Sequence, residues 1–193
     1  MAQPDLSIIV VAFNMRREVM RTLTSLALPY QKEITEEQYE VIVVENGSSE
    51  PLNRMEVENH GSNFFYHYLE SPPPSPAFAI NYGLARARGK FVSIMVDGAH
   101  MATPGLLSYT IAACSSVNMP VVLSQRFHLG PGPQPETVSK GYNQTIEDEL
   151  LASIEWPADG YRLFEIGYPL MVLRKKQRYF WFSRMFESNY LVM

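Results

Sequence analysis

The sequence predicts an α/β fold in which helices flank a mostly parallel sheet. Leu6–Phe13, Tyr39–Val44 and Phe91–Val96 are apolar at nearly every residue, which is typical of strands covered on both faces. Segments with helical spacing of apolar residues alternate with these strands, and this alternation indicates right-handed crossovers between parallel strands. Polar residues follow each strand directly, at the edge where open α/β sheets bind ligands.

The first strand and helix follow each other closely. Asn14 comes directly after the strand Leu6–Phe13 and is a favoured N-cap residue. Apolar residues then recur at helical spacing, at Met15, Val19, Leu23 and Leu26. Pro29 ends this predicted helix, and a charged loop leads to the second strand, Tyr39–Val44. That strand stops at the turn-forming residues Glu45–Ser48.

A third strand and a proline-rich connection come next. Asn63–Leu69 is predicted to be a strand that is more exposed than the first two. We interpret Ser71–Pro76 as a rigid connection, with a linker or a recognition motif as the alternative. Pro76 suits the first turn of a helix that Gly89 ends, and Phe91–Val96 then supplies the central strand.

The second half of the chain is less regular. Pro104–Cys114 is predicted to be a helix and Pro120–Leu123 a short strand. A shift toward Gly, Pro and Gln predicts a long surface loop at 128–145, and Ile146–Ile154 a short acidic helix. Phe186–Met193 is predicted to be a strand. We expect residues 1–193 to form a single domain whose natural chain continues further, because a domain seldom stops on an apolar strand.

Composition narrows the classes of function. The net charge of −4, with scattered basic residues, argues against a nucleic-acid surface. The single cysteine, Cys114, excludes an internal disulfide and suits a reducing compartment. The sequence contains no basic leader or long apolar segment, so we expect a cytoplasmic protein without a membrane span. Peripheral association with a membrane stays open, and composition does not predict an oligomeric state.

Several common catalytic and binding motifs are absent. The first strand is followed by Ala12–Met15 rather than by the glycine fingerprint of dinucleotide binding. The sequence also lacks Gly-x-Ser-x-Gly, His-Glu-x-x-His and paired Cys-x-x-Cys motifs. We interpret His60, His67 and His128 as core or surface residues. Asp97 remains open to two interpretations: a carboxylate that meets a substrate directly or through a metal ion, or a helix N-cap or turn residue.

The order of the polar segments points to one enzyme family. Ser7–Asn14 is similar to an opening strand that closes on an aromatic-Asn pair, and Val41–Ser49 to a second strand that ends in Asp-Asp-Gly-Ser or Asp-Asn-Gly-Ser. Ala79–Phe91 is similar to a helix of the form Ala-Arg-Asn-x-Gly-x-x-x-Ala-x-Gly-x-Tyr. Val96–His100 lies where the family carries Asp-x-Asp, and Phe186–Asn189 resembles the segment before its Gly-Gly-Phe-Asp region. Together they resemble the family-2 glycosyltransferases, whose GT-A fold is a Rossmann-like, open α/β/α sandwich.

The resemblance implies an enzyme of the hexosyltransferase class with a nucleotide-sugar site at the strand ends. It places the donor against Val11, Ala12, Phe13, Glu45, Asn81, Asp97 and Gly98. The first three would offer backbone groups and an apolar wall to the base, and Glu45 would accept a hydrogen bond from a base imide or a ribose hydroxyl. Asp97 would meet the ribose or a bridging metal ion. The acceptor would be a hydroxyl of an unknown glycan, lipid or small molecule, attacking with inversion.

The metal site departs from the family pattern. Asp97 and His100 are the candidate ligands of Mg²⁺ or Mn²⁺, because Ala99 stands where the second acid of Asp-x-Asp is expected. Ile80 replaces the family's Arg, and Glu45 replaces its usual Asp. The family's catalytic base normally lies beyond the Gly-Gly-Phe-Asp region, so no residue is assigned to that role. The departures favour one alternative, a catalytically silent GT-A module that binds a nucleotide or a protein partner.

Overall fold

The computed structural model describes residues 3–124, 126–169 and 190–192. Its contacts divide the chain into two compact units, residues 1–122 with 189–193, and residues 123–188. The sequence analysis expected one domain. The residues after Leu123 form a small sheet and helices, which supply the second unit with its own internal contacts, and the single domain stays a prediction.

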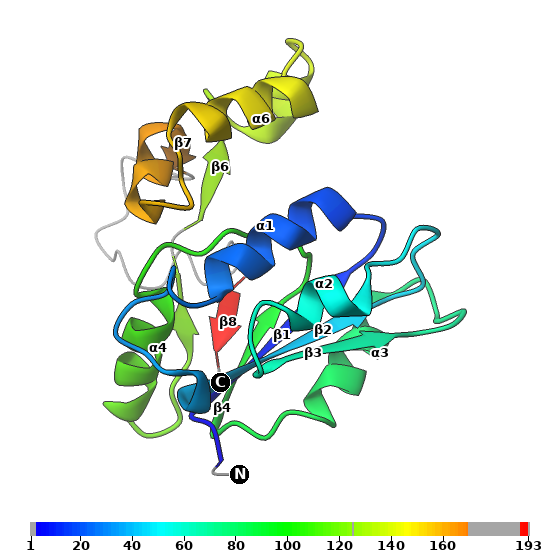
Figure 1. The fold of residues 1–193 in the computed structure, drawn as a ribbon, viewed down its shortest axis with the longest axis vertical. Coiled ribbons are helices and arrows are strands. Elements are labelled where there is room, and N and C mark those ends of the chain that lie inside the picture. The colour runs from blue at the N-terminus through cyan, green and yellow to red at the C-terminus, as the bar shows by residue number, and fades with distance from the viewer. Residues whose placement is uncertain (1–2, 125, 170–189, 193) are drawn as a thin grey trace, which may run out of the picture. The chain divides into compact units, whose positions relative to one another are not determined.

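The first unit is built on a mixed, mainly parallel sheet (Figure 1). The six strands lie in the order β3-β2-β1-β4-β8-β5. They are β1 (Leu6–Ala12), β2 (Tyr39–Glu45), β3 (Phe64–Tyr68), β4 (Phe91–Met95), β5 (Val122–Leu123) and β8 (Tyr190–Val192). Strands β1 to β4 pair in parallel, whereas β8 runs antiparallel to β4. The predicted α/β class and mostly parallel sheet are confirmed.

Helices cover both faces of this sheet, as the uninterrupted apolar strands predict. The unit contains α1 (Arg16–Leu26), the 3₁₀ helix η1 (Glu36–Gln38), α2 (Arg54–Glu58), α3 (Pro76–Leu84) and α4 (Leu106–Ser115). The core on the α1, α2 and α4 side includes Ile8, Val10, Val41 and Val43. The core on the α3 side includes Ile9, Val11, Ile42 and Val44. Successive strand residues therefore point to opposite cores, with the period of two that a strand imposes.

Local chemistry moves three of the predicted boundaries. Helix α1 takes Met15 rather than Asn14 as its N-cap, because Asn14 has a φ of 53° and its Oδ1 accepts from the Ser49 amide. Helix α3 ends at Leu84, well before Gly89. A Cβ at Gly89 would lie 2.4 Å from the Ser7 backbone nitrogen, so this glycine permits close backbone contact with β1. Strand β4 ends at Met95, which leaves Asp97 in the turn that follows.

The second unit contains regular structure where a long loop was expected. Its described elements are β6 (Phe127–Leu129), α5 (Gln134–Val138), α6 (Gln144–Ser153), the 3₁₀ helix η2 (Gly160–Glu165) and β7 (Gly167–Pro169). The expected loop at 128–145 thus includes part of β6, all of α5 and the start of α6. Strand β6 is stabilised by antiparallel pairing with β7, a partner far along the chain that local composition does not reveal. The acidic helix near 146–154 corresponds to α6. Of the strand expected at Phe186–Met193, residues 186–189 and 193 lie outside the described residues.

Candidate functional site

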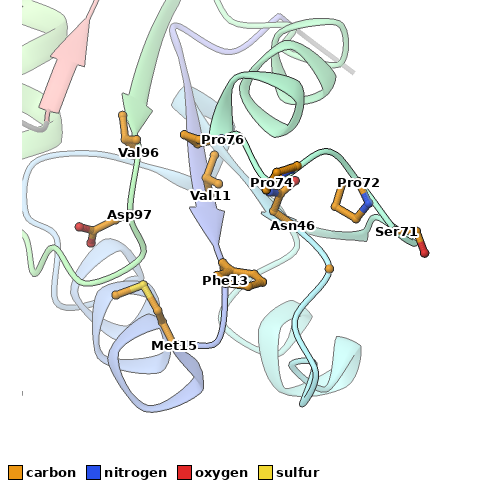
Figure 2. A pocket seen from close by; sticks show the side chains of 11 residues that line it. Val11, Phe13, Met15, Asn46, Ser71, Pro72, Pro74, Pro76, Val96 and Asp97 are labelled. Atoms are coloured by element: carbon orange, nitrogen blue, oxygen red, sulfur yellow. The ribbon is translucent and has the colours of Figure 1, made fainter.

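A pocket of about 400 Å³ lies at the carboxyl ends of β1, β2 and β4. Its walls combine residues from these strand ends with the proline-rich segment that precedes α3 (Figure 2). The lining residues are Val11, Phe13, Met15, Asn46, Gly47, Ser71, Pro72, Pro74, Pro76, Val96 and Asp97. The prolines form a wall that offers few amide donors, because proline has no backbone N–H.

The sheet order sets the layout of the pocket. Strand β1 lies between β2 and β4, so residues after β2 and β4 approach the pocket from opposite sides of β1. In Figure 2, Asn46 and Asp97 lie on opposite sides, with Val11 and Phe13 between them. Phe13 is 55% exposed, so it presents apolar surface to the pocket that it lines. The pocket therefore has a polar group at each side and an apolar middle.

Asn46 presents an acceptor without a partner. The residue is only 7% exposed, and its backbone amide donates to the Ala12 carbonyl at 2.8 Å. Its side-chain Nδ2 donates to the Pro73 carbonyl at 3.5 Å, which leaves Oδ1 buried with no hydrogen-bond partner among the described residues. Buried polar atoms in folded proteins are nearly always satisfied, so this oxygen is an acceptor that a water molecule or a ligand could pair, in a residue that lines the pocket.

Glu45, which the sequence analysis assigned to the donor, does not line the pocket. It is 2% exposed, and its Oε2 accepts from the Leu52 amide at 2.8 Å and from the Tyr66 hydroxyl. Burial, together with the hydrogen bond to Glu45 and its charge, raises the pKa of Tyr66 above its usual value. Its Oε2 is therefore already occupied by two donors away from the pocket lining, and the donor contact assigned to Glu45 stays a prediction.

Strand periodicity explains why Asn46, and not its neighbour Glu45, lines the pocket. Val11 pairs with Val44 in the parallel register, and both belong to the core on the α3 side. Residues two further along each strand, Phe13 and Asn46, continue on that side. Glu45 shares the opposite side with Val43, under α1 and α2. The sequence could have indicated Asn46. Side chains on one face of a sheet recur at every second residue of a strand, so Asn46 follows from Val44 on the face that Val11 and Phe13 also share.

Three further predicted donor residues lie outside the pocket. Ala12 is 1% exposed, and its carbonyl already accepts from Asn46. The Gly98 carbonyl accepts from the Thr22 hydroxyl at 2.6 Å, and a Cβ at Gly98 would lie 2.3 Å from Val19 Cγ2. Gly98 therefore permits close packing of the β4 turn on α1. Asn81 is exposed on α3, because the buried residues Ala79 and Gly83, two positions before and after it, occupy the face toward the sheet.

Asp97 and His100, the predicted metal ligands, lie close together. His100 Nε2 is 3.6 Å from Asp97 Oδ1, and the same oxygen accepts from the Ala99 amide at 2.9 Å. The Asp97 side chain is 49% exposed and lines the pocket. Within the described part of the chain there is no cluster of three or more metal-binding side chains. One carboxylate and one imidazole nevertheless fit Mg²⁺ or Mn²⁺, which commonly take their other ligands from substrate phosphates and water.

Comparison with known proteins agrees with this geometry. Residues 7–165 match the family model "Glycosyl transferase family 2". The chain belongs to glycosyl transferase family 2. No curated protein matches the sequence significantly.

Solved structures similar to this family-2 chain include three of S. aureus TarS. TarS 1-349 is 27% identical with a TM-score of 0.58, over 67% of this chain and 38% of that one. Its complex with UDP is 26% identical with a TM-score of 0.57, again over 67% of this chain and 38% of the TarS chain. The complex with UDP-GlcNAc, 24% identical with a TM-score of 0.55 over 67% of this chain and 37% of TarS, supports the fold. The matched region spans well under half of TarS.

Within the first unit of this family-2 chain, His60, His67 and Cys114 do not line the pocket. His60 Nδ1 lies 2.9 Å from the Glu56 carbonyl at the end of α2, and its ring stacks near Phe64. His67 packs edge-on against Tyr82. Cys114 is buried in α4, and burial raises the pKa of its thiol, which does not suit a nucleophile. Across the described residues, no helix combines the length and the apolar character that crossing a bilayer requires.

Proposed function

We propose that this chain binds a uridine diphosphate sugar and takes part in transferring its sugar, a hexose, to an acceptor hydroxyl. The observation that carries the proposal is the buried, unpartnered Oδ1 of Asn46 in a pocket whose opposite side carries Asp97. The family supports glycosyl transfer in general, and the UDP complex of TarS supports uridine as the base. The acceptor, a glycan, lipid or small molecule, is left open.

The nucleoside occupies the side of the pocket near Asn46 in this proposal. Asn46 Oδ1 would accept a hydrogen bond from the N3–H of uracil, which is the donor on the edge of that base. Phe13 and the prolines at 72 and 74 provide apolar surface for the ring. The contact of Asn46 Nδ2 with the Pro73 carbonyl, at 3.5 Å, favours the amide orientation in which Oδ1 is left for the base.

The diphosphate lies toward Asp97. Asp97 would hold a divalent cation through its carboxylate, with His100 as a second ligand. When bound, such a cation offsets the negative charge that develops on the departing diphosphate. The backbone amide of Ala99 keeps the Asp97 carboxylate in place, through a hydrogen bond of 2.9 Å. Transfer is proposed to invert the anomeric carbon, with the acceptor hydroxyl attacking from the side opposite the diphosphate.

Calorimetric titration tests this proposal. We expect UDP to bind the full chain in the presence of Mn²⁺. CDP should bind at least about tenfold more weakly, because cytosine has no N3–H that could donate a hydrogen bond to Asn46. Asn46→Ala is expected to bring the two affinities close together. Failure of saturating UDP to bind with either Mn²⁺ or Mg²⁺ would contradict the proposal.

A second candidate is a nucleotide-binding module without transferase activity. Ala99 in place of the second acid of Asp-x-Asp favours it, because one potential metal ligand is missing. Release of UDP from UDP-sugars, measured with and without candidate acceptors, separates the two functions. Turnover in the wild-type chain that Asp97→Ala abolishes would exclude the silent module.

A further inference from the structure

We infer that Glu45 and Tyr66 are positioning residues that hold the Asn46 amide in register with the base. This inference rests on the proposed function, in which Asn46 accepts from the base. It assigns a role to two side-chain groups that meet next to Asn46 in the sequence of β2, the Glu45 carboxylate and the Tyr66 hydroxyl that donates to it.

The carboxylate of Glu45 closes the β2–α2 loop onto the end of its own strand. Its Oε2 accepts from the Leu52 amide at 2.8 Å, across the loop that begins with Asn46. The backbone carbonyl of Glu45 accepts from the Leu69 amide at 2.9 Å, so main chain and side chain are both anchored. The loop start therefore cannot shift without breaking a hydrogen bond to a buried carboxylate, which is costly.

Tyr66 fixes the position of that carboxylate. Tyr66 lies in β3, where it pairs with Val43 of β2. Its hydroxyl donates to the same Glu45 Oε2 that accepts from the Leu52 amide. The Tyr66 ring is 5% exposed, and the Arg54 guanidinium lies 5.5 Å from the ring centroid. Because the Tyr66 residue is buried, its hydroxyl has little freedom, and the carboxylate is held between two donors.

Asn46 lies between this anchor and a second one at the end of β1. Its amide donates to Ala12, while Asn14 accepts from Ser49 at 2.9 Å and donates to the Ser48 hydroxyl at 2.8 Å. The loop is thus tied to β1 on one side and to Glu45 on the other. A binding group must usually be held within about 0.5 Å of its productive position by such supporting contacts. Without the hydrogen bonds of the Glu45 carboxylate, we expect Asn46 Oδ1 to be held less precisely.

The experiment measures how well the chain recognises the N3–H of uracil. The quantity is the ratio of the dissociation constants of N3-methyl-UDP and UDP, measured with Mn²⁺ for the wild type and for the variants Glu45→Gln and Tyr66→Phe. Tyr66→Phe removes only a hydroxyl that does not line the pocket, so any loss of discrimination must pass through Glu45. We expect this ratio to fall by about threefold or more in both variants. In Asn46→Ala we expect the two dissociation constants to become nearly equal.

Glu40→Gln is the matched control. Glu40 is also a glutamate on β2 with 2% exposure, but its carboxylate binds Ser7 and Arg88 at the opposite end of the strand. We expect this variant to unfold at a lower temperature and to keep the wild-type ratio. A merely structural role of Glu45 would instead give both glutamate variants the same result, lower stability with unchanged discrimination.

The outcomes separate this inference from the proposed function. A wild type that binds neither ligand would overturn the function. A wild type that discriminates, together with Tyr66→Phe and Glu45→Gln variants that keep the full ratio, would overturn the positioning role alone. If Glu45→Gln does not fold by circular dichroism, Tyr66→Phe decides the question by itself, because it keeps the ring and its packing.

Discussion

At the scale of single residues, the pocket depends on a few polar atoms with different surroundings. Asn46 is neutral, buried and fixed through its backbone and Nδ2. Asp97 is charged and half exposed, and within the described residues it contacts the local turn and His100. Changes at Asp97 should therefore affect ligand binding with little effect on folding, because few packing contacts depend on its side chain.

The first prediction concerns Asp97→Asn. We expect this variant to bind UDP with Mn²⁺ at least about tenfold more weakly, since even changes to groups that only support a metal ligand cost that much. Its affinity for uridine should stay within about twofold of the wild type, since uridine carries no phosphate for a cation to bridge. Calorimetry with both ligands, and melting curves for stability, measure these effects. Equal losses for uridine and UDP would indicate that Asp97 contacts the nucleoside instead.

At the scale of elements, contacts between the sheet and its helices decide where the strand ends lie. Gly98 brings the turn after β4 against α1, and its carbonyl is held there by Thr22. On the other face, His67 of β3 packs against Tyr82 of α3, beneath the Arg86 guanidinium, which lies 3.4 Å from the Tyr82 ring centroid. Each contact predicts a measurable effect on stability.

Gly98→Ala should destabilise the chain by about 1–3 kcal/mol, the usual range for overpacking a tight contact. The added methyl would lie 2.3 Å from Val19 Cγ2, so the turn or the helix must shift. Combining it with Val19→Ala makes room, and the double variant should be more stable than the sum of the two single losses predicts. Urea unfolding of the four proteins provides the comparison. Strict additivity would show that Gly98 does not act through its packing on Val19.

His67 predicts a dependence of stability on pH. Burial, and then the charges of Arg86 and Arg54, lower the pKa of His67 below its ordinary value of 6.5. The unfolded chain therefore binds the proton more tightly, so the contribution to stability is complete above pH 6.5 and is lost as the pH falls toward the folded-state pKa. In His67→Gln, the free energy of unfolding should decline less between pH 7 and pH 5. Parallel slopes for variant and wild type would contradict this.

At the scale of the whole molecule, the charge of the pocket matters more than the net charge of the chain. Asp97 is the single charged side chain among the described residues that line it. A diphosphate entering beside a carboxylate meets repulsion that a divalent cation would reverse. The chain as a whole is also acidic, with a net charge of −4.

Removal of divalent metal should therefore weaken the binding of UDP much more than the binding of uridine. With EDTA, we expect UDP to lose about tenfold or more in affinity, while uridine changes little. Mn²⁺ added back in excess should restore UDP binding, and Ca²⁺ or Mg²⁺ would measure how selective the site is. UDP binding that is equally tight in EDTA would show that the phosphates are held by other groups.

The sequence by itself determined the architecture, because each β-branched run must bury both of its faces and each following helix must return the chain for a parallel partner. It also determined the family, through four short segments in a fixed order, and the pocket residues Val11, Phe13 and Asp97. Only the tertiary structure shows that Asn46 lines the pocket and Glu45 does not, since this depends on which face of β2 is covered by α1 and α2. It likewise reassigned Gly98 and Asn81, because the packing of α1 and α3 on the sheet, rather than residue type, decides which groups reach the pocket.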